Sequence, residues 1–147
     1  MAALKLRAAD AEDLAVVSAI LQDALVAVGE MAYLPEEHRF VLVANRFRWE
    51  GRPGSRRKDL ERTLTGLCID GVTAVRRRGF HPRDTDRILS LLALRVDSDE
   101  RPAVMTLDFA GGSSIRLEVE RLLCHLDDLG EPWPTRWRPK HPVAQSG

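Results

Sequence analysis

The chain has 147 residues, of which 44% are apolar and 30% are charged, and its formal net charge is zero. This length and composition suit one folded domain whose core needs no disulfide or metal. The longest apolar stretch, residues 14–28, is too short and polar to span a bilayer, and the N-terminus lacks a secretory signal. We therefore expect a soluble, cytoplasmic protein without membrane association.

The first third of the chain predicts a strand, a helix and two further strands. Residues 4–7 alternate as a strand does, and Asp10 is placed to cap a helix over residues 11–20. Residues 25–28 look extended, and Pro35 lies in the connection to a strand over residues 39–50. Along that strand we expect a buried face of Val41, Val43, Asn45, Phe47 and Trp49, and a solvent face of Arg46 and Arg48.

The remaining two thirds predict more strands and one further helix. Residues 51–58 contain no apolar residue and predict a surface loop, and residues 62–75 read as a strand with a bend at Gly71. Residues 88–96 are apolar on both faces, which indicates a central strand. Residues 104–109 and 114–119 flank a Gly-Gly pair and predict a hairpin. Leu122, Leu123, Leu126 and Leu129 have helical spacing before Gly130, which predicts a C-terminal helix.

These elements predict an α+β fold that is mostly antiparallel β. We expect a strand meander or partial barrel with one N-terminal and one C-terminal helix, a layout similar to that of pleckstrin-homology domains. Residues 1–130 would form this single domain. Residues 131–147 carry four prolines with Trp133 and Trp137, and we expect them to form an extended tail.

Two segments of the chain resemble each other. Residues 20–50 align without a gap with residues 67–97, at an offset of 47 positions. This similarity has two explanations: an internal duplication, or the limited number of ways in which a strand–turn–strand unit can be written. Either explanation predicts that the segments superpose, with Phe47 and Leu94 both facing the core.

The sequence contains no motif of a known catalytic or metal centre. Nucleotide-binding glycine loops, zinc-protease helices and nucleophile elbows are all missing from it. Cys68 and Cys124 have no ligand-like spacing, so we interpret both as core thiols. We therefore expect no catalytic residue, no metal and no cofactor.

The neutral net charge conceals an uneven distribution of charges. Residues 46–87 hold twelve basic against six acidic side chains, whereas residues 97–131 hold three basic against nine acidic ones. Arginines suit phosphate or carboxylate partners, so the basic segment is a candidate surface for an anionic partner. Its candidate residues are Arg46, Arg48, Arg56, Arg57, Lys58, Arg76, Arg77 and Arg78.

The tail is a second candidate binding element. Trp133 and Trp137 lie among prolines, and tryptophans in such a segment seldom stay in water. They either dock onto the domain's own sheet or bind a partner in extended form.

Several segments together resemble one known family. They are the Tyr33-Leu34-Pro35 turn, residues 45–50, the Gly111-Gly112 hairpin with residues 115–120, and the ending from Asp128 to Trp133. They are similar to the alphaproteobacterial family filed as domain of unknown function 2948. The resemblance implies a single domain in the bacterial cytoplasm, and no activity, cofactor or catalytic residue.

Three functions follow from these observations as hypotheses. The first is a non-catalytic binding or adaptor module that contacts a protein partner through its arginines or its tail. The second is a small RNA- or nucleotide-associated protein that uses the same arginines. The third is an enzyme of a class that the sequence does not reveal.

Overall fold

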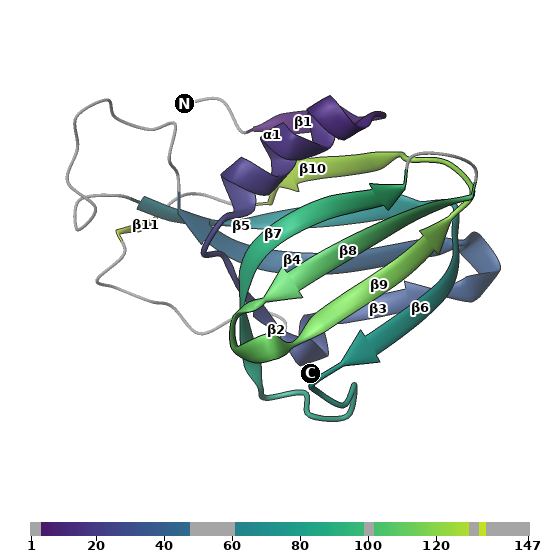
Figure 1. The fold of residues 1–147 in the computed structure, drawn as a ribbon. Helices are drawn as coiled ribbons and strands as arrows, with labels where there is room; N and C mark the ends of the chain where they lie inside the picture. The colour runs from purple at the N-terminus through teal and green to yellow at the C-terminus, as the bar shows by residue number, and fades with distance from the viewer. Residues whose placement is uncertain (1–3, 48–60, 99–101, 130–132, 135–147) are drawn as a thin grey trace.

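The structure is a computed structural model that describes residues 4–47, 61–98, 102–129 and 133–134 (Figure 1). It contains one α-helix and antiparallel strands, with short 3₁₀ turns at Val28–Glu30, Pro35–Glu37 and Ala110–Gly112. The elements in chain order are β1 (Lys5–Ala8), α1 (Ala11–Leu21), β2 (Leu25–Ala27), β3 (Met31–Leu34), β4 (Arg39–Phe47), β5 (Glu61–Asp70), β6 (Val72–Arg78), β7 (Ile88–Ser98), β8 (Ala103–Phe109), β9 (Ser114–Val119), β10 (Cys124–Asp128) and β11 (Trp133–Pro134).

The strands form two layers that are joined along one side. Their order is β1-β10-β5-β4-β2-β7-β8-β9-β6, with β3 beside β4 and β11 beside β5. Figure 1 shows β7, β8, β9 and β6 in front of a layer that contains β10, β5, β4 and β3, and β2 connects the layers by pairing with both β4 and β7. The end strands β1 and β6 do not pair with each other, so the sheet is not closed into a barrel.

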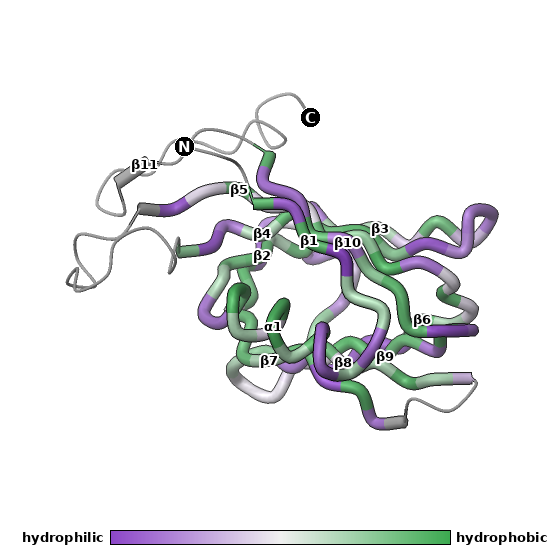
Figure 2. Tube along the Cα trace, turned by 90° about the horizontal axis from the view of Figure 1, so that it is seen from above, coloured by the Kyte–Doolittle hydropathy of each residue, from purple (hydrophilic) through white to green (hydrophobic). Residues whose placement is uncertain are grey.

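The hydrophobic core lies between the two layers, which Figure 2 shows from above. Leu67 and Ile69 of one layer and Leu107 and Leu117 of the other are each at most 1% exposed. The helix α1 lies beside the opening between the layers and buries Leu14, Val17 and Leu21 there. Burying these aliphatic side chains supplies the main driving force for folding.

The structure confirms the predicted α+β class and the N-terminal helix. The Asp10 side chain caps α1 by accepting a hydrogen bond of 2.7 Å from the Asp13 N–H. The predicted hairpin is also present, because β8 pairs with β9 across a turn in which Gly111 and Gly112 have positive φ angles. Within the described parts of the chain, no helix has the length and apolarity needed to cross a membrane.

The prediction of a C-terminal helix is wrong. The segment forms strand β10, which pairs with β5 on one side and β1 on the other. Cys124 and Leu126 face the core at alternate positions, whereas Leu129 is 56% exposed. The helical spacing of the leucines was therefore coincidental. The segment instead buries every second side chain, as a strand does. The helix of the pleckstrin-homology-like layout is therefore missing from this segment, which pairs as a strand of the sheet instead.

The predicted faces of β4 are partly wrong: Asn45 and Phe47 are buried, as predicted, but Val41 and Val43 do not face the core, and Trp49 lies outside the described residues. Phe40, Leu42 and Ala44 point into the core, whereas Val41 and Val43 lie on the outer face. Residues on both faces of this strand are apolar, so alternation alone could not show which face is buried.

The two similar segments do not form the same unit. In residues 20–50, β3 and β4 pair with each other as a hairpin. In residues 67–97, β6 pairs with β9 and β7 pairs with β8. Leu94 belongs to the core, whereas Phe47 is buried outside it against the Arg62 guanidinium, which lies 3.8 Å from the ring centre. The prediction that both segments superpose with these side chains in the core is wrong.

Candidate anionic-partner surface

Arg46, a predicted binding residue, does not lie on the surface. It points to the inner side of β4 and is 0% exposed. Its guanidinium contacts Asp128 on β10, with Nη2 2.9 Å from Oδ2, and Nε donates to Thr65 Oγ1 at 2.9 Å. The prediction of a solvent-facing Arg46 is therefore wrong, and its role is to join β4, β5 and β10.

Each oxygen of the Asp128 carboxylate has hydrogen-bond partners. Oδ1 accepts from Thr65 Oγ1 at 2.7 Å, and Oδ2 accepts from the Leu4 N–H at 2.9 Å in addition to Arg46. Burial pushes the pKa of Asp128 upward, but the hydrogen bonds from Thr65, Leu4 and Arg46 and the charge of Arg46 outweigh it. The pKa of Asp128 is therefore lowered below its usual value, and the carboxylate is charged in the folded state.

This lowered pKa predicts a pH-dependent contribution to stability. The pKa of Asp128 is lower in the folded state than in the unfolded state, so the charged carboxylate stabilises the fold fully at neutral pH. This stabilisation declines as the pH falls through about 4 and is lost below the folded-state pKa. We expect the difference in unfolding free energy between the wild type and Asp128→Asn to shrink with acidification, as measured by urea unfolding from pH 7 to 3. The exposed Asp86→Asn is the control. A difference that stays constant with pH would contradict the assignment.

Several predicted site residues cannot be placed. Arg48, Arg56, Arg57, Lys58 and Trp137 lie outside the described residues. The backbone of Trp133–Pro134 forms β11 and pairs with Arg62 and Glu61 of β5, while the Trp133 side chain also lies outside the described part. A role of the tail in partner binding stays a prediction.

The three consecutive arginines of β6 divide between two faces. Arg76 and Arg78 are exposed on the outer face of the front layer, and Arg77 is partly buried on the opposite face with Val75. The division follows from strand geometry, in which successive side chains alternate. The structure therefore brings together Arg76 and Arg78, but not Arg77.

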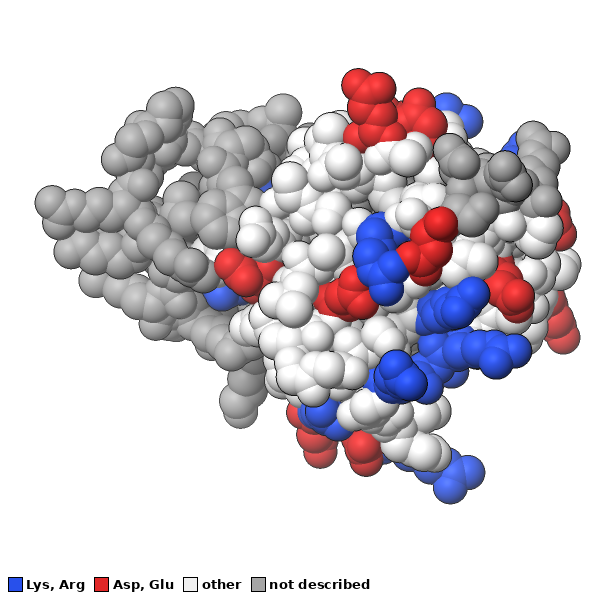
Figure 3. All heavy atoms as spheres, in the orientation of Figure 1, with Lys and Arg blue, Asp and Glu red and all other residues white. Residues whose placement is uncertain are grey.

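A third arginine, which sequence reasoning did not select, completes the surface. Arg116 on β9 is exposed and lies directly opposite Arg76 in the antiparallel pairing, while Ser114 lies opposite Arg78. Within the described residues, no carboxylate oxygen lies within 4.0 Å of the guanidinium nitrogens of Arg76, Arg78 or Arg116. We call Arg76, Arg78 and Arg116 the arginine face; Figure 3 shows the basic side chains that gather on this side of the molecule.

Arg95, on strand β7 of the same layer, differs from the arginine face because carboxylates pair with it. Arg95 on β7 donates from Nε to Asp108 Oδ2 at 2.7 Å and also contacts Asp97. Asp97 in turn accepts a hydrogen bond from Thr106. Arg95 is therefore neutralised by two carboxylates on its own face of the sheet, and the unneutralised positive charge lies at the β9–β6 end.

The outer face of the other layer carries one cluster with side chains that occur in catalytic sites. Cys68 and His125 lie opposite each other on β5 and β10, and Asp70 lies 3.4 Å from His125 Nδ1 and 3.1 Å from Arg39 Nε. Burial and the charge of Asp70 raise the pKa of the Cys68 thiol, which makes it a poor nucleophile. The described residues hold no group of three or more side chains suited to a metal ion.

Cys124 is a core residue, as the sequence predicted. It is 1% exposed, and burial raises the pKa of its thiol to about 12. The neighbouring His125 points to the opposite side of β10, so the two side chains do not form a nucleophile–base pair.

Comparison with family models supports the resemblance drawn from the sequence. Residues 4–141 match the model described as a protein of unknown function, DUF2948. The chain belongs to this family. No curated protein and no solved structure matches the chain. Because the match covers both strand layers, the arginine face and the Arg46–Asp128 pair lie within the family's domain.

Part of the arginine face could be predicted from the sequence. Alternation in residues 114–119 places Arg116 outward, opposite in direction to Ile115 and Leu117. It could not show that β9 pairs with β6, because β7 and β8 separate these strands along the chain. The arginine face therefore emerges only from the strand order.

Proposed function

We propose that this protein is a non-catalytic binding module whose arginine face binds an acidic protein partner. The observation that supports this proposal is the direct opposition of Arg76 and Arg116 across β6 and β9. Like charges that face each other across an antiparallel pair are destabilising, by about 0.2–1 kcal/mol. A bound carboxylate between the two guanidinium groups would remove this repulsion.

The surroundings of the arginine face favour a protein over a nucleic acid. Glu118 lies on the same outer face of β9, two positions from Arg116, and a phosphate backbone following the strand would be repelled by it. The described residues that alternate onto the outer face of β6, β8 and β9 include no aromatic side chain on which a base could stack. The guanidinium fork matches a carboxylate bidentately, so the three arginines can hold carboxylates at defined positions.

Binding to a defined acidic probe tests the proposal. The probe is a fluorescein-labelled peptide of eight glutamates, and the competing probe is a single-stranded oligouridylate. We expect Arg76→Glu combined with Arg116→Glu to weaken peptide binding at least tenfold, as measured by fluorescence anisotropy. The control Lys5→Glu combined with Arg7→Glu makes the same change in charge on β1, an edge strand of the other layer, and should bind as the wild type does.

The charge-reversed protein should fold normally, because both substitutions are at exposed positions and each costs within about 0.5 kcal/mol. Equal peptide binding by the two double variants would overturn the proposal. Tighter binding of the oligouridylate than of the peptide, with loss in the same variant, would replace the protein partner by RNA.

A neutral substitution provides an independent readout. Arg116→Thr removes the like-charge opposition, so we expect a slightly higher unfolding free energy together with weaker peptide binding. If Arg116→Thr lowers both stability and binding, Arg116 is a structural residue and the proposal loses its main support.

A further inference from the structure

Strand β6 is the last strand of the sheet, so it has an outer edge on the side away from β9. Among the described residues, no strand pairs with β6 on the side away from β9 (Figure 1). At the start of the strand this edge is closed, because the Val72 N–H donates to the His38 carbonyl and the Val72 carbonyl accepts from Tyr33 Oη. Beyond Val72, no hydrogen bond from the described residues closes the edge.

The pairing register shows which backbone groups face this edge. The Phe109 N–H donates to the Ser113 carbonyl at the end of the β8–β9 hairpin. In an antiparallel ladder, pairs of opposite residues alternate between hydrogen-bonded and non-hydrogen-bonded. Counted from the bonded pair of Phe109 and Ser113, Arg116 is in a non-bonded pair with β8. Its backbone N–H and C=O groups therefore point away from β8 and toward Arg76. The N–H and C=O groups of Val75 and Arg77 consequently point outward from the sheet, toward the open edge.

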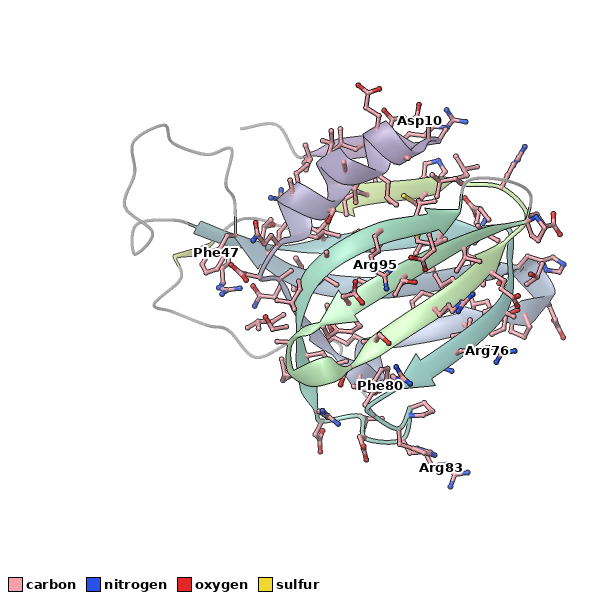
Figure 4. The ribbon with its side chains drawn as sticks, viewed as in Figure 1. Asp10, Phe47, Arg76, Phe80, Arg83 and Arg95 are labelled. Atoms are coloured by element: carbon pink, nitrogen blue, oxygen red, sulfur yellow. The ribbon has the colours of Figure 1, made fainter. Side chains whose placement is uncertain are left out.

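The same strand thus presents two kinds of recognition group. Val75 and Arg77 offer backbone donors and acceptors in the plane of the sheet, while Arg76 and Arg78 offer guanidinium groups on its outer face. Figure 4 labels Arg76 at this edge of the front layer. Main-chain hydrogen bonds to an open edge supply affinity for an extended peptide, and side chains at alternate positions supply specificity.

A second copy of the chain is a poor occupant of this edge. Pairing of β6 with another β6 would bring the arginines at positions 76–78 of both copies together, and like charges on paired strands repel. An acidic strand has the complementary charge.

We propose that β6 binds an extended acidic segment of the partner as an additional antiparallel strand. In this arrangement alternate acidic side chains lie beside Arg76 and Arg78, and the residues between them form hydrogen bonds with Val75 and Arg77. The inference rests on the proposed function, since it specifies how the acidic partner is held.

Backbone methylation of a peptide tests this arrangement without changing its charge. The probe is a blocked peptide of four Val-Glu repeats. When its glutamates lie on the outer face beside Arg76 and Arg78, its valines are opposite Val75 and Arg77, and their N–H groups point to β6. We expect N-methylation of the valines to weaken binding at least tenfold, and N-methylation of the glutamates, whose N–H groups point to solvent, to leave binding within about twofold.

The outcomes separate this inference from the proposed function. Equal binding of the two methylated peptides, with loss in Arg76→Glu combined with Arg116→Glu, would overturn strand addition and leave the arginine face as a charged surface. Failure of every peptide to bind the wild type would overturn both proposals. Val75→Pro removes one outward N–H and keeps all charges, so a folded Val75→Pro protein should also lose affinity for the unmethylated peptide.

Discussion

Replacing Arg46 with alanine is expected to lower the unfolding free energy by about 3–5 kcal/mol, the largest effect of any single substitution considered. The guanidinium is 0% exposed, and the side chain of its partner Asp128 is 4% exposed. Removal of one charge leaves the other in the core without a counter-ion. Urea unfolding monitored by circular dichroism measures the loss, provided that the denaturant slope is unchanged.

A double replacement separates the buried charge from the packing around it. Arg46→Met combined with Asp128→Leu removes both charges and keeps apolar volume, so it should recover most of the stability lost in Arg46→Ala. An unpaired charge and lost packing, as causes of the destabilisation, predict different unfolding free energies for this double variant. If the double variant is less stable than Arg46→Ala, the hydrogen bonds that Asp128 accepts from Thr65 and the Leu4 N–H matter more than the unpaired charge.

Arg46 also shows where prediction from the sequence reaches its limit. The alternation of residues 39–50 predicted a strand, which the structure has at Arg39–Phe47. The prediction placed Arg46 in solvent because arginines are rarely buried without a partner. The partner is Asp128, 82 positions further along the chain, in a segment that was predicted to be a helix. No local pattern could reveal this pair, because its energy depends on which strands become neighbours.

The candidate surface was predicted in part for the same reason. The run of arginines at positions 76–78 is visible in the sequence, and so is the outward direction of Arg116. Only the pairing of β6 with β9 places Arg116 opposite Arg76 and separates Arg77 from the other two. Elements held by local signals, such as the Asp10-capped helix and the Gly-Gly hairpin, were predicted correctly, whereas arrangements that depend on distant pairing were not.

The second large effect is expected at Gly79, which follows directly after the arginines of β6. Gly79→Ala should lower the unfolding free energy by about 2–4 kcal/mol, because two costs combine. Gly79 has a φ of +84°, which a residue with a side chain rarely adopts. In addition, an added Cβ would lie 2.9 Å from the Cα of Ser113, a backbone atom of the tight turn before β9, and 2.7 Å from its Oγ.

A matched substitution isolates the second of these costs. Gly112 has a φ of +86°, and nothing lies within 4 Å of the position that its Cβ would occupy. Gly112→Ala should therefore cost only the conformational part, about 1–2 kcal/mol. Equal destabilisation of the two variants in urea unfolding would contradict the close approach of Gly79 to Ser113. A larger loss in Gly79→Ala would support it, and would show that the end of β6 is held against the turn that leads into Arg116.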